Sequence, residues 1–324
     1  MATLTGFHCR PETTSVNVTD EHPLFNPRAL SFDTPPLQHL EESIYQLLWN
    51  GATGIFVVGF ARSGKTTALR RILAELKDRS LNPIPSLHFT TARRDTQSLL
   101  SLHKSLCQQF DVLVRSRDTP ADMAKRMASL LREEAVKTNS NRLVLCIDDA
   151  QKLFIEQWDV FSEINTYLEY EPRIHLCLIS VFDAHYAAPL LKKFSAPHFD
   201  YLRGRYMNRV LEFSGIRSAK ELKKVLNAYD TQVYPNNSEV TYTETALPEA
   251  FTSGWRLSDQ ARLLWQVYCD HRPKGEDKNW GMQSVIDTVQ LLLLDYLAIE
   301  GVHRLDEDLI EHCYCLVNPS VENP

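Results

Sequence analysis

The sequence predicts an α/β fold: a parallel five-stranded sheet sandwiched by helices, followed by a small helical lid. Three observations lead to this prediction. Five short apolar segments alternate with helical patterns up to about residue 215, and strands that are apolar throughout are typical of parallel sheets covered on both faces. A glycine-rich loop joins the first apolar segment to a helix. Beyond residue 215, no further strand pattern is evident.

The chain opens with a stretch of little order. Residues 1–34 are polar, rich in Thr, Asn and Pro, and without periodicity, so we expect an extended arm that is ordered only where it packs on something. Pro35-Pro36 then opens a helix whose apolar positions run from Leu37 to Leu48, and Asn50-Gly51 ends it. This helix begins a nucleotide-binding domain of residues 35–215.

Strands and helices alternate through this domain. Thr119-Pro120-Ala121-Asp122 carries a clear helix start, with a Thr N-cap, Pro at the first position and an acid in the first turn. The expected strands are 55–58, 84–91, 143–147, 174–181 and 210–213, and the expected helices between them are 68–76, 99–110, 120–131 and 152–170.

Residues 216–324 are expected to form the helical lid and an acidic C-terminal tail. Helical patterns cover 218–229, 254–271, 281–299 and 305–316, and a polar loop covers 230–246. The termini are the candidates for contacts with protein partners, a hypothesis from charge alone.

Residues 59–66 read Gly-Phe-Ala-Arg-Ser-Gly-Lys-Thr, a phosphate-binding loop between a strand and a helix. Two glycines let the backbone aim several N–H groups at one anion, and the helix adds its positive N-terminal end. Lys65 is expected to reach the β- and γ-phosphates and Thr66 to bind Mg²⁺. The expected nucleotide contacts are Gly59, Ala61, Arg62, Ser63, Gly64, Lys65, Thr66 and Thr67. ATP and Mg²⁺ are therefore the expected cofactors.

Asp148-Asp149 follows the apolar run Val144-Leu145-Cys146-Ile147 and is the expected partner of the loop. The first acid should meet the Mg²⁺ held by Thr66, and the second should polarise the attacking water. The alternative is that these two acids are only the charged end of a strand. Their occurrence together with the phosphate-binding loop disfavours this alternative.

Composition limits the class of protein. The chain has 324 residues, 44% hydrophobic and 23% charged, and seven cysteines, which fit reduced thiols in the cytoplasm. The apolar run 291–299 is interrupted by Asp295 and too short for a bilayer, so no membrane association is expected. The net charge of −6 conceals a basic stretch at 192–224, with nine Lys/Arg against three Asp/Glu.

The chain resembles the AAA+ ATPases, and within them the transposition regulators TnsC, TniB and the phage Mu B protein. The resemblance covers about residues 35 to 270 and rests on particular motifs. They are Pro36-Leu37-Gln38, the loop at 59–66, Ile-Asp-Asp-Ala-Gln at 147–151, Ser180, Arg205-Tyr206 and Gly254-Trp255-Arg256.

The resemblance implies roles for single residues. Ser180 would sense the γ-phosphate from the end of its strand, and Arg256 would reach the phosphates from the lid. Leu37 would contact the nucleotide. Arg205 would be the arginine finger supplied to a neighbouring subunit, with Arg203 and Arg209 as close competitors.

One position departs from the family. Where these ATPases usually carry Glu, this chain has Asp149, whose side chain is one methylene shorter. The attacking water would be held less well, so we expect slow ATP hydrolysis, activated by a partner.

The implied activity is ATP-dependent, sequence-independent binding of double-stranded DNA by a homo-oligomer, either a ring or a filament. The oligomer would link target-selection proteins to a transposase. Arg93, Arg94, Lys192 and Lys193 are the candidate DNA contacts, since basic side chains on phosphates give salt-sensitive binding. Two alternatives remain: a helicase-loader-like DNA-remodelling ATPase, and a nucleotide-gated scaffold or signalling protein with little hydrolysis.

Overall fold

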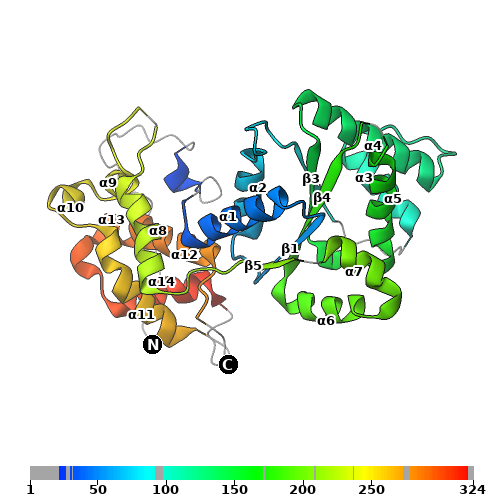
Figure 1. The fold of residues 1–324 in the computed structure, drawn as a ribbon. Coiled ribbons are helices and arrows are strands. Elements are labelled where there is room, and N and C mark those ends of the chain that lie inside the picture. Colours follow the sequence, from blue (N-terminus) through cyan, green and yellow to red (C-terminus); the bar gives the residue numbers. More distant parts are fainter. Residues whose placement is uncertain are drawn as a thin grey trace.

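The chain forms an α/β domain and a helical lid (Figure 1). The computed structural model describes residues 22–26, 30, 32–91, 98–170, 172–207, 209–235, 237–272 and 278–319. The backbone after the last strand crosses from the α/β domain into the lid.

A five-stranded sheet lies at the centre of the α/β domain. Its order is β2-β3-β4-β1-β5, and every neighbouring pair is parallel. The strands are β1 (Gly54–Gly59), β2 (Ser86–Thr90), β3 (Arg142–Asp148), β4 (His175–Asp183) and β5 (Val210–Glu212). The prediction of a five-stranded parallel sheet is confirmed.

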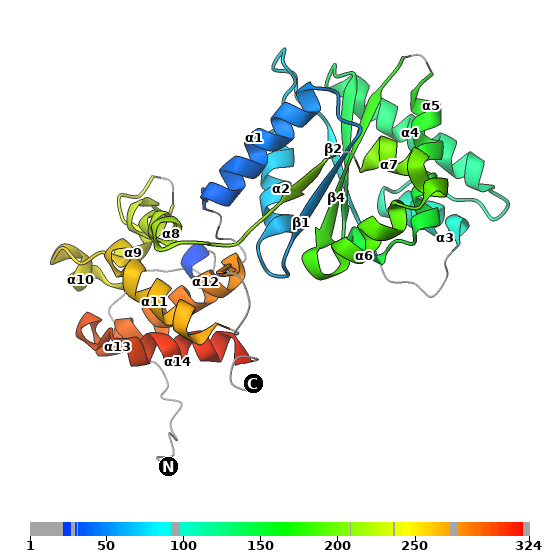
Figure 2. The same cartoon turned by 60° about the horizontal axis from the view of Figure 1, so that its bottom comes forward.

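Helices cover both faces of this sheet (Figures 1 and 2). One face packs against α1 (Pro35–Trp49) and α2 (Lys65–Ala74). The opposite face packs against α3 (Leu99–Gln109), α4 (Pro120–Lys137), α5 (Asp159–Leu168), α6 (Ala184–Phe194) and α7 (Asp200–Tyr206). Because strand side chains alternate, Ile55 and Val57 enter the first core and Phe56 enters the second.

The segment after β3 differs from its prediction. A helix was expected over 152–170, but two 3₁₀ turns, η3 (Ala150–Lys152) and η4 (Ile155–Trp158), precede α5. Leu153 and Phe154 between them are extended, which breaks the helical run. Trp158 is fully buried against the aromatic rings of Phe56 and Phe182, so core packing takes precedence over local helical propensity here.

The lid consists of helices joined by loops, with two isolated antiparallel bridges, Ile216–Trp280 and Val233–Thr241, among its described residues. The long helices α8 (Ala219–Thr231) and α11 (Ala261–His271) pack against each other, and α11 also packs on α14 (Glu307–Val317). The remaining elements are α9 (Tyr242–Ala246), α10 (Pro248–Thr252), η6 (Leu257–Gln260), α12 (Met282–Gln290), the π-helical segment η7 (Leu291–Leu297), α13 (Ala298–Glu300) and η8 (Val302–Arg304).

Residues near the N-terminus complete the core of the lid. Leu24, Leu30 and Phe32 are buried among lid residues, and Gln290 Nε2 donates a 2.7 Å hydrogen bond to the carbonyl oxygen of Leu24. The short 3₁₀ helix η1 (Pro23–Phe25) belongs to this segment. At the other end, α14 buries Ile310, Cys313 and Tyr314 in the same core. Both termini therefore contribute residues to the core of the lid, and the hypothesis that they contact protein partners stays a prediction.

One described helical stretch, Met282–Glu300, is long and apolar enough to cross a membrane by length and composition. Half of its most apolar window is buried inside the protein. Val285, Val289 and Leu293 from this stretch are buried in the core of the lid. A helix buried in the core of a protein can be as apolar as one that spans a membrane.

Replacing Leu24 by alanine is expected to destabilise the lid by about 2–5 kcal/mol, because a fully buried leucine leaves a cavity when truncated. Thermal unfolding followed by circular dichroism measures the loss. Val136→Ala, at an exposed position near the end of α4, is the control and should leave the melting temperature within error. Equal melting temperatures for the two variants would contradict the placement of Leu24.

Candidate nucleotide-binding site

The phosphate-binding loop lies between β1 and α2, as its sequence predicts. Gly64 has φ +95°, a conformation that residues with a side chain rarely adopt. A Cβ atom on Gly59 would lie 2.3 Å from the carbonyl oxygen of Phe213, so only glycine fits there. Phe60, Ala61 and Arg62 are exposed at the tip of the loop, while Ser63 is buried and its hydroxyl has no hydrogen-bond partner within the described chain.

Lys65 is the first residue of α2, and its side chain turns back onto the phosphate-binding loop. Its Nζ atom donates hydrogen bonds to the carbonyl oxygens of Gly59 at 2.6 Å and Phe60 at 2.5 Å. Burial lowers the pKa of Lys65, while the negative charges of Asp183, Asp148 and Asp149 act to raise it. The ammonium group is thus bonded inside the loop and feels the charge of three carboxylates, and the phosphates of a nucleotide would replace its carbonyl partners.

Thr66 and Asp148 meet across the end of the sheet. The Thr66 hydroxyl donates a 2.9 Å hydrogen bond to Asp148 Oδ2, although 82 positions separate them in the sequence. A hydroxyl and a carboxylate oxygen are hard ligands of the kind that Mg²⁺ prefers, with nucleotide phosphates and water completing its shell. The pair therefore fits the magnesium site predicted from the sequence.

Asp149 has left-handed backbone dihedral angles, φ 55° and ψ 38°. Its carboxylate is engaged at both oxygens: Oδ2 lies 2.6 Å from Lys152 Nζ, and Oδ1 accepts a 3.0 Å hydrogen bond from Gln151 Nε2. Sequence reasoning missed Lys152, because a lysine in a predicted helix carries no signal that it faces an acid three positions earlier.

Ser180 is not at the end of its strand. The sequence interpretation ended the strand near this residue, but β4 continues to Asp183, and Ser180 is fully buried between Phe56 of β1 and Ile147 of β3. Its hydroxyl has no partner among the described residues. Asp183 is the polar side chain at the strand end, and its charge acts on Lys65. The prediction that Ser180 closes the strand is therefore wrong, and Asp183 takes that position.

Arg256 does not reach the loop in this structure. Its Nη1 atom donates 2.8 Å hydrogen bonds to the carbonyl oxygens of Phe251 and Trp255, and its guanidinium lies 3.7 Å from the centre of the Phe251 ring. Phe251 belongs to α10, at the end of the lid farthest from the sheet (Figure 2). In this structure the Arg256 side chain is held within the lid, and its contact with phosphates stays a prediction.

A different part of the lid touches the loop. The backbone N–H of Gln283 donates a 3.2 Å hydrogen bond to the carbonyl oxygen of Arg62, and a Cβ atom on Gly64 would lie 3.5 Å from Met282. Both lid residues lie in the first turn of α12, which is beside the loop end of the sheet in Figure 2. The first turn of α12 is thus a part of the lid that contacts the phosphate-binding loop.

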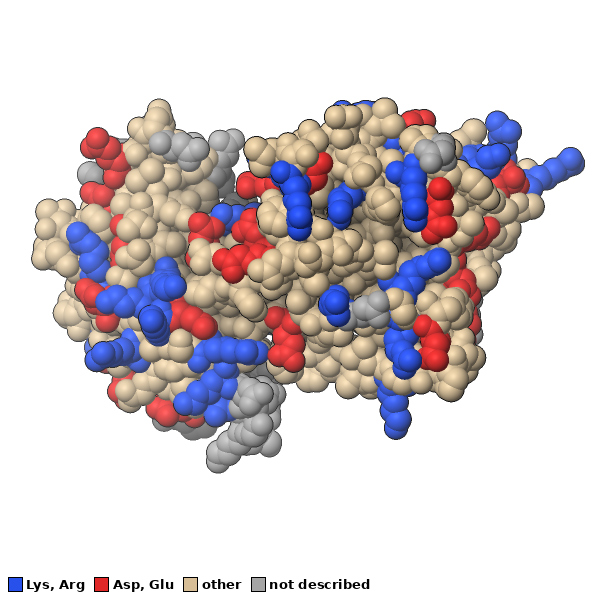
Figure 3. All heavy atoms as spheres, in the orientation of Figure 1, with Lys and Arg blue, Asp and Glu red and all other residues tan. Residues whose placement is uncertain are grey.

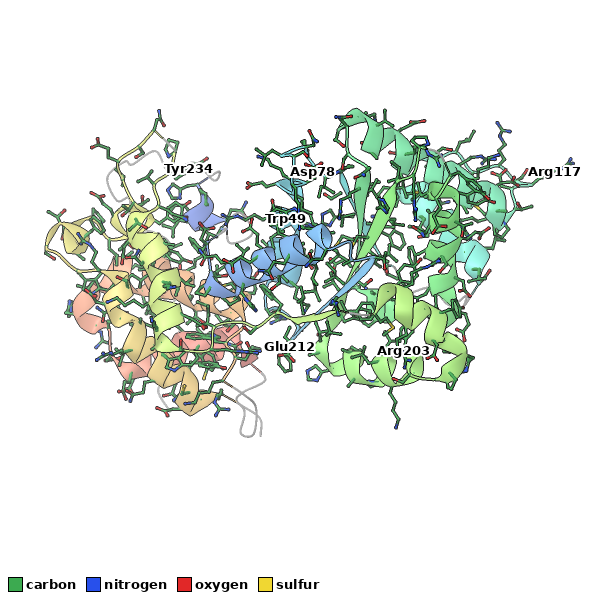
Figure 4. The ribbon with its side chains drawn as sticks, in the orientation of Figure 1. Trp49, Asp78, Arg117, Arg203, Glu212 and Tyr234 are labelled. Carbon is green, nitrogen blue, oxygen red and sulfur yellow. The ribbon has the colours of Figure 1, made fainter. Side chains whose placement is uncertain are left out.

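The three candidates for the arginine finger, Arg203, Arg205 and Arg209, lie on α7 or just after it. Arg203 forms a 2.8 Å ion pair with Asp200 in its own helix (Figure 4). Arg205 is exposed on α7, and Arg209 is exposed next to β5. All three remain candidates for reaching a neighbouring subunit.

The remaining predicted residues divide into described and undescribed ones. Leu37 is buried with α2 and the sheet, and Thr67 is exposed on the first turn of α2. Lys192 and Lys193 are exposed in the last turn of α6, and neither forms an ion pair within the described chain. Arg93 and Arg94 lie outside the described residues.

Comparison with known proteins agrees with this architecture. Residues 50–188 match the family model of an AAA domain, a stretch that contains the phosphate-binding loop and Asp148-Asp149. Together with the sheet order, this match shows the AAA+ P-loop fold. It also supports nucleotide hydrolysis in general. No sequence among the curated proteins matches the chain.

Three solved structures are similar at low identity. Cdc6p from Pyrobaculum aerophilum is 14% identical, with a TM-score of 0.48 over 94% of this chain and 84% of that chain. C. elegans PCH-2 is 10% identical, with a TM-score of 0.42 over 91% and 71%. Drosophila ORC bound to DNA is 13% identical, with a TM-score of 0.34 over 56% and 93%. At these values the likenesses carry no argument about activity or partners.

Proposed function

We propose that this chain is an ATP-dependent, DNA-binding AAA+ regulator of DNA transposition. It oligomerises on double-stranded DNA and links target-selection proteins to a transposase, and it acts in the cytoplasm. The observation that carries the ATP-dependent part is the meeting of Lys65, Thr66 and Asp148 at one end of the sheet, with the 2.9 Å hydrogen bond between Thr66 and Asp148.

Exposed basic side chains support the DNA-binding part. The bases of α6 and α7 are exposed, including Lys192, Lys193 and Arg205, and phosphate contacts by such bases need no sequence readout. Figure 3 shows Lys and Arg over both the lid and the α/β domain, interleaved with acids. The transposition role rests on the resemblance of the motifs at 36–38, 59–66 and 147–151.

Electron microscopy of the purified protein tests this proposal directly. The protein is imaged with double-stranded DNA and with ATP, a non-hydrolysable analogue, ADP or no nucleotide. We expect rings or filaments only where triphosphate and DNA are both present. A monomer under every condition would contradict the proposal.

A nucleotide-gated scaffold is the second candidate. The capture of both Asp149 oxygens by Lys152 and Gln151 favours it, since a carboxylate held this way is slow to activate water. Assembly with triphosphate but without DNA, together with negligible hydrolysis, would favour the scaffold. A helicase-loader-like ATPase would assemble on DNA but would not stimulate a transposase.

Arg205→Ala is expected to keep ATP binding and to lower hydrolysis in the oligomer by about 10³-fold, the scale reported for an arginine finger. Mixing this variant with an Asp149→Asn variant, which is expected to keep ATP binding, should restore part of the activity. An interface in which the Asp149→Asn subunit supplies the finger to the loop of an Arg205→Ala subunit has both parts intact. Arg203→Ala is the matched control from the same helix. A large loss for Arg203→Ala or Arg209→Ala, with Arg205→Ala unaffected, would transfer the role to that residue.

A further inference from the structure

The carboxylate of Asp149 is held by side chains of the turn that follows it. Lys152 Nζ lies 2.6 Å from Oδ2, and Gln151 Nε2 donates a 3.0 Å hydrogen bond to Oδ1. Gln151 also links this turn to the next strand, since its Oε1 accepts a 3.4 Å hydrogen bond from the backbone N–H of Asp183. Each oxygen that could act on water therefore already accepts one hydrogen bond.

The backbone holds Lys152 in this position. The N–H of Lys152 donates a 3.0 Å hydrogen bond to the carbonyl oxygen of Asp149, which closes the 3₁₀ turn η3. Ala150 and Leu153 anchor the turn in the core. The left-handed conformation of Asp149 folds its side chain back over the turn, a conformation that Asp tolerates better than most residues. The ion pair is thus a product of the turn itself.

The other charged groups of the site have partners that nucleotide and metal would replace. Lys65 is bonded to two carbonyl oxygens and Asp148 to the hydroxyl of Thr66. Asp149 differs, because its partner is a lysine that neither ATP nor Mg²⁺ displaces by occupying the loop. The water-activating carboxylate stays paired until Lys152 itself moves.

We propose that Lys152 is a positioning residue that restrains Asp149 in the resting protein and thereby keeps basal hydrolysis slow. This inference rests on the proposed ATPase function. Asp149 and Lys152 keep 43% and 34% of their side-chain surface exposed, so the pair is weak enough to open and is screened by salt. Opening it frees Oδ2 to accept a proton from the attacking water.

Lys152→Met tests the restraint, because it keeps the length of the stem and removes the charge. We expect kcat for ATP without DNA to rise about two- to fivefold, the rate equivalent of losing a partly exposed ion pair, while KM stays unchanged. Raising the ionic strength should increase kcat of the wild type toward that of the variant, and should have little effect on the variant. Lys152→Arg should restore the slow rate.

Lys137→Met is the matched control. Lys137 forms an ion pair of the same 2.6 Å length and the same three-residue spacing with Glu134 on α4, away from the site, so its kcat should equal that of the wild type. Titration with a fluorescent ATP analogue checks that all variants bind nucleotide.

An unchanged or lower kcat for Lys152→Met, with nucleotide binding intact, overturns the inference and leaves the proposed function standing. Hydrolysis no higher than that of Lys65→Ala in every variant overturns the proposed function and this inference with it. The two failures are therefore distinguishable.

Discussion

Replacing Lys65 by alanine is expected to lower ATP turnover by about 10²–10³-fold, the usual loss when a donor to developing negative charge is removed. The expectation follows from the position of the ammonium group, which lies inside the loop within hydrogen-bond distance of the Gly59 and Phe60 carbonyl oxygens. Phosphate release at saturating ATP measures the loss.

Assembly should fail in the same variant, because the proposed oligomer needs bound triphosphate. Lys125→Ala, on the exposed face of α4, is the control and should assemble normally. If Lys65→Ala still formed triphosphate-dependent rings or filaments, the loop would not be the site that governs assembly.

Replacing Asp149 by asparagine is expected to lower turnover by about 10²–10⁴-fold while ATP binding persists, since a general base contributes on this scale. Lys65, Thr66 and Asp148, which would hold the nucleotide and the metal, are unchanged. Asparagine also tolerates the left-handed backbone conformation at this position, so the turn should survive. Single-turnover hydrolysis and analogue binding, measured on the same samples, separate chemistry from affinity.

The sharpest contrast is between the two variants of the same ion pair. Asp149→Asn and Lys152→Met both break it, yet the first should slow hydrolysis and the second should speed it. Wild-type turnover in Asp149→Asn would place the base elsewhere, and Asp183, at the end of the next strand, would be the first alternative.

The central features of the fold could be predicted because local signals agree with the tertiary structure. Val144 to Ile147 is apolar throughout and lies in a strand buried on both faces, and the loop at 59–66 needs its glycines for backbone geometry alone. The meeting of Thr66 and Asp148 followed from the two motifs together, since both end up at the carboxyl edge of a parallel sheet.

Other features depend on information that the local sequence does not carry. The end of β4 was misjudged because Val181 and Phe182 continue the apolar pattern and only the register with β1 extends the strand to Asp183. From the sequence alone, Arg256 could face either the phosphates or its own lid. In the folded structure its guanidinium lies over the ring of Phe251, a contact that the local sequence does not indicate. Leu24 looked like part of a polar arm because residues of the lid bury it, among them Gln290, which is 266 positions away in the chain.

The insertion of Leu24, Leu30 and Phe32 into the lid has a mechanical consequence. The lid is attached to the α/β domain by two covalent connections, one entering α1 at Pro35 and one leaving β5 after Glu212. A body held at one point can swivel in any direction, whereas a body held at two points turns about the line that joins them. Movement of the lid relative to the phosphate-binding loop is therefore restricted by both connections, which limits the directions in which the N-terminus of α12 can move relative to Gly64.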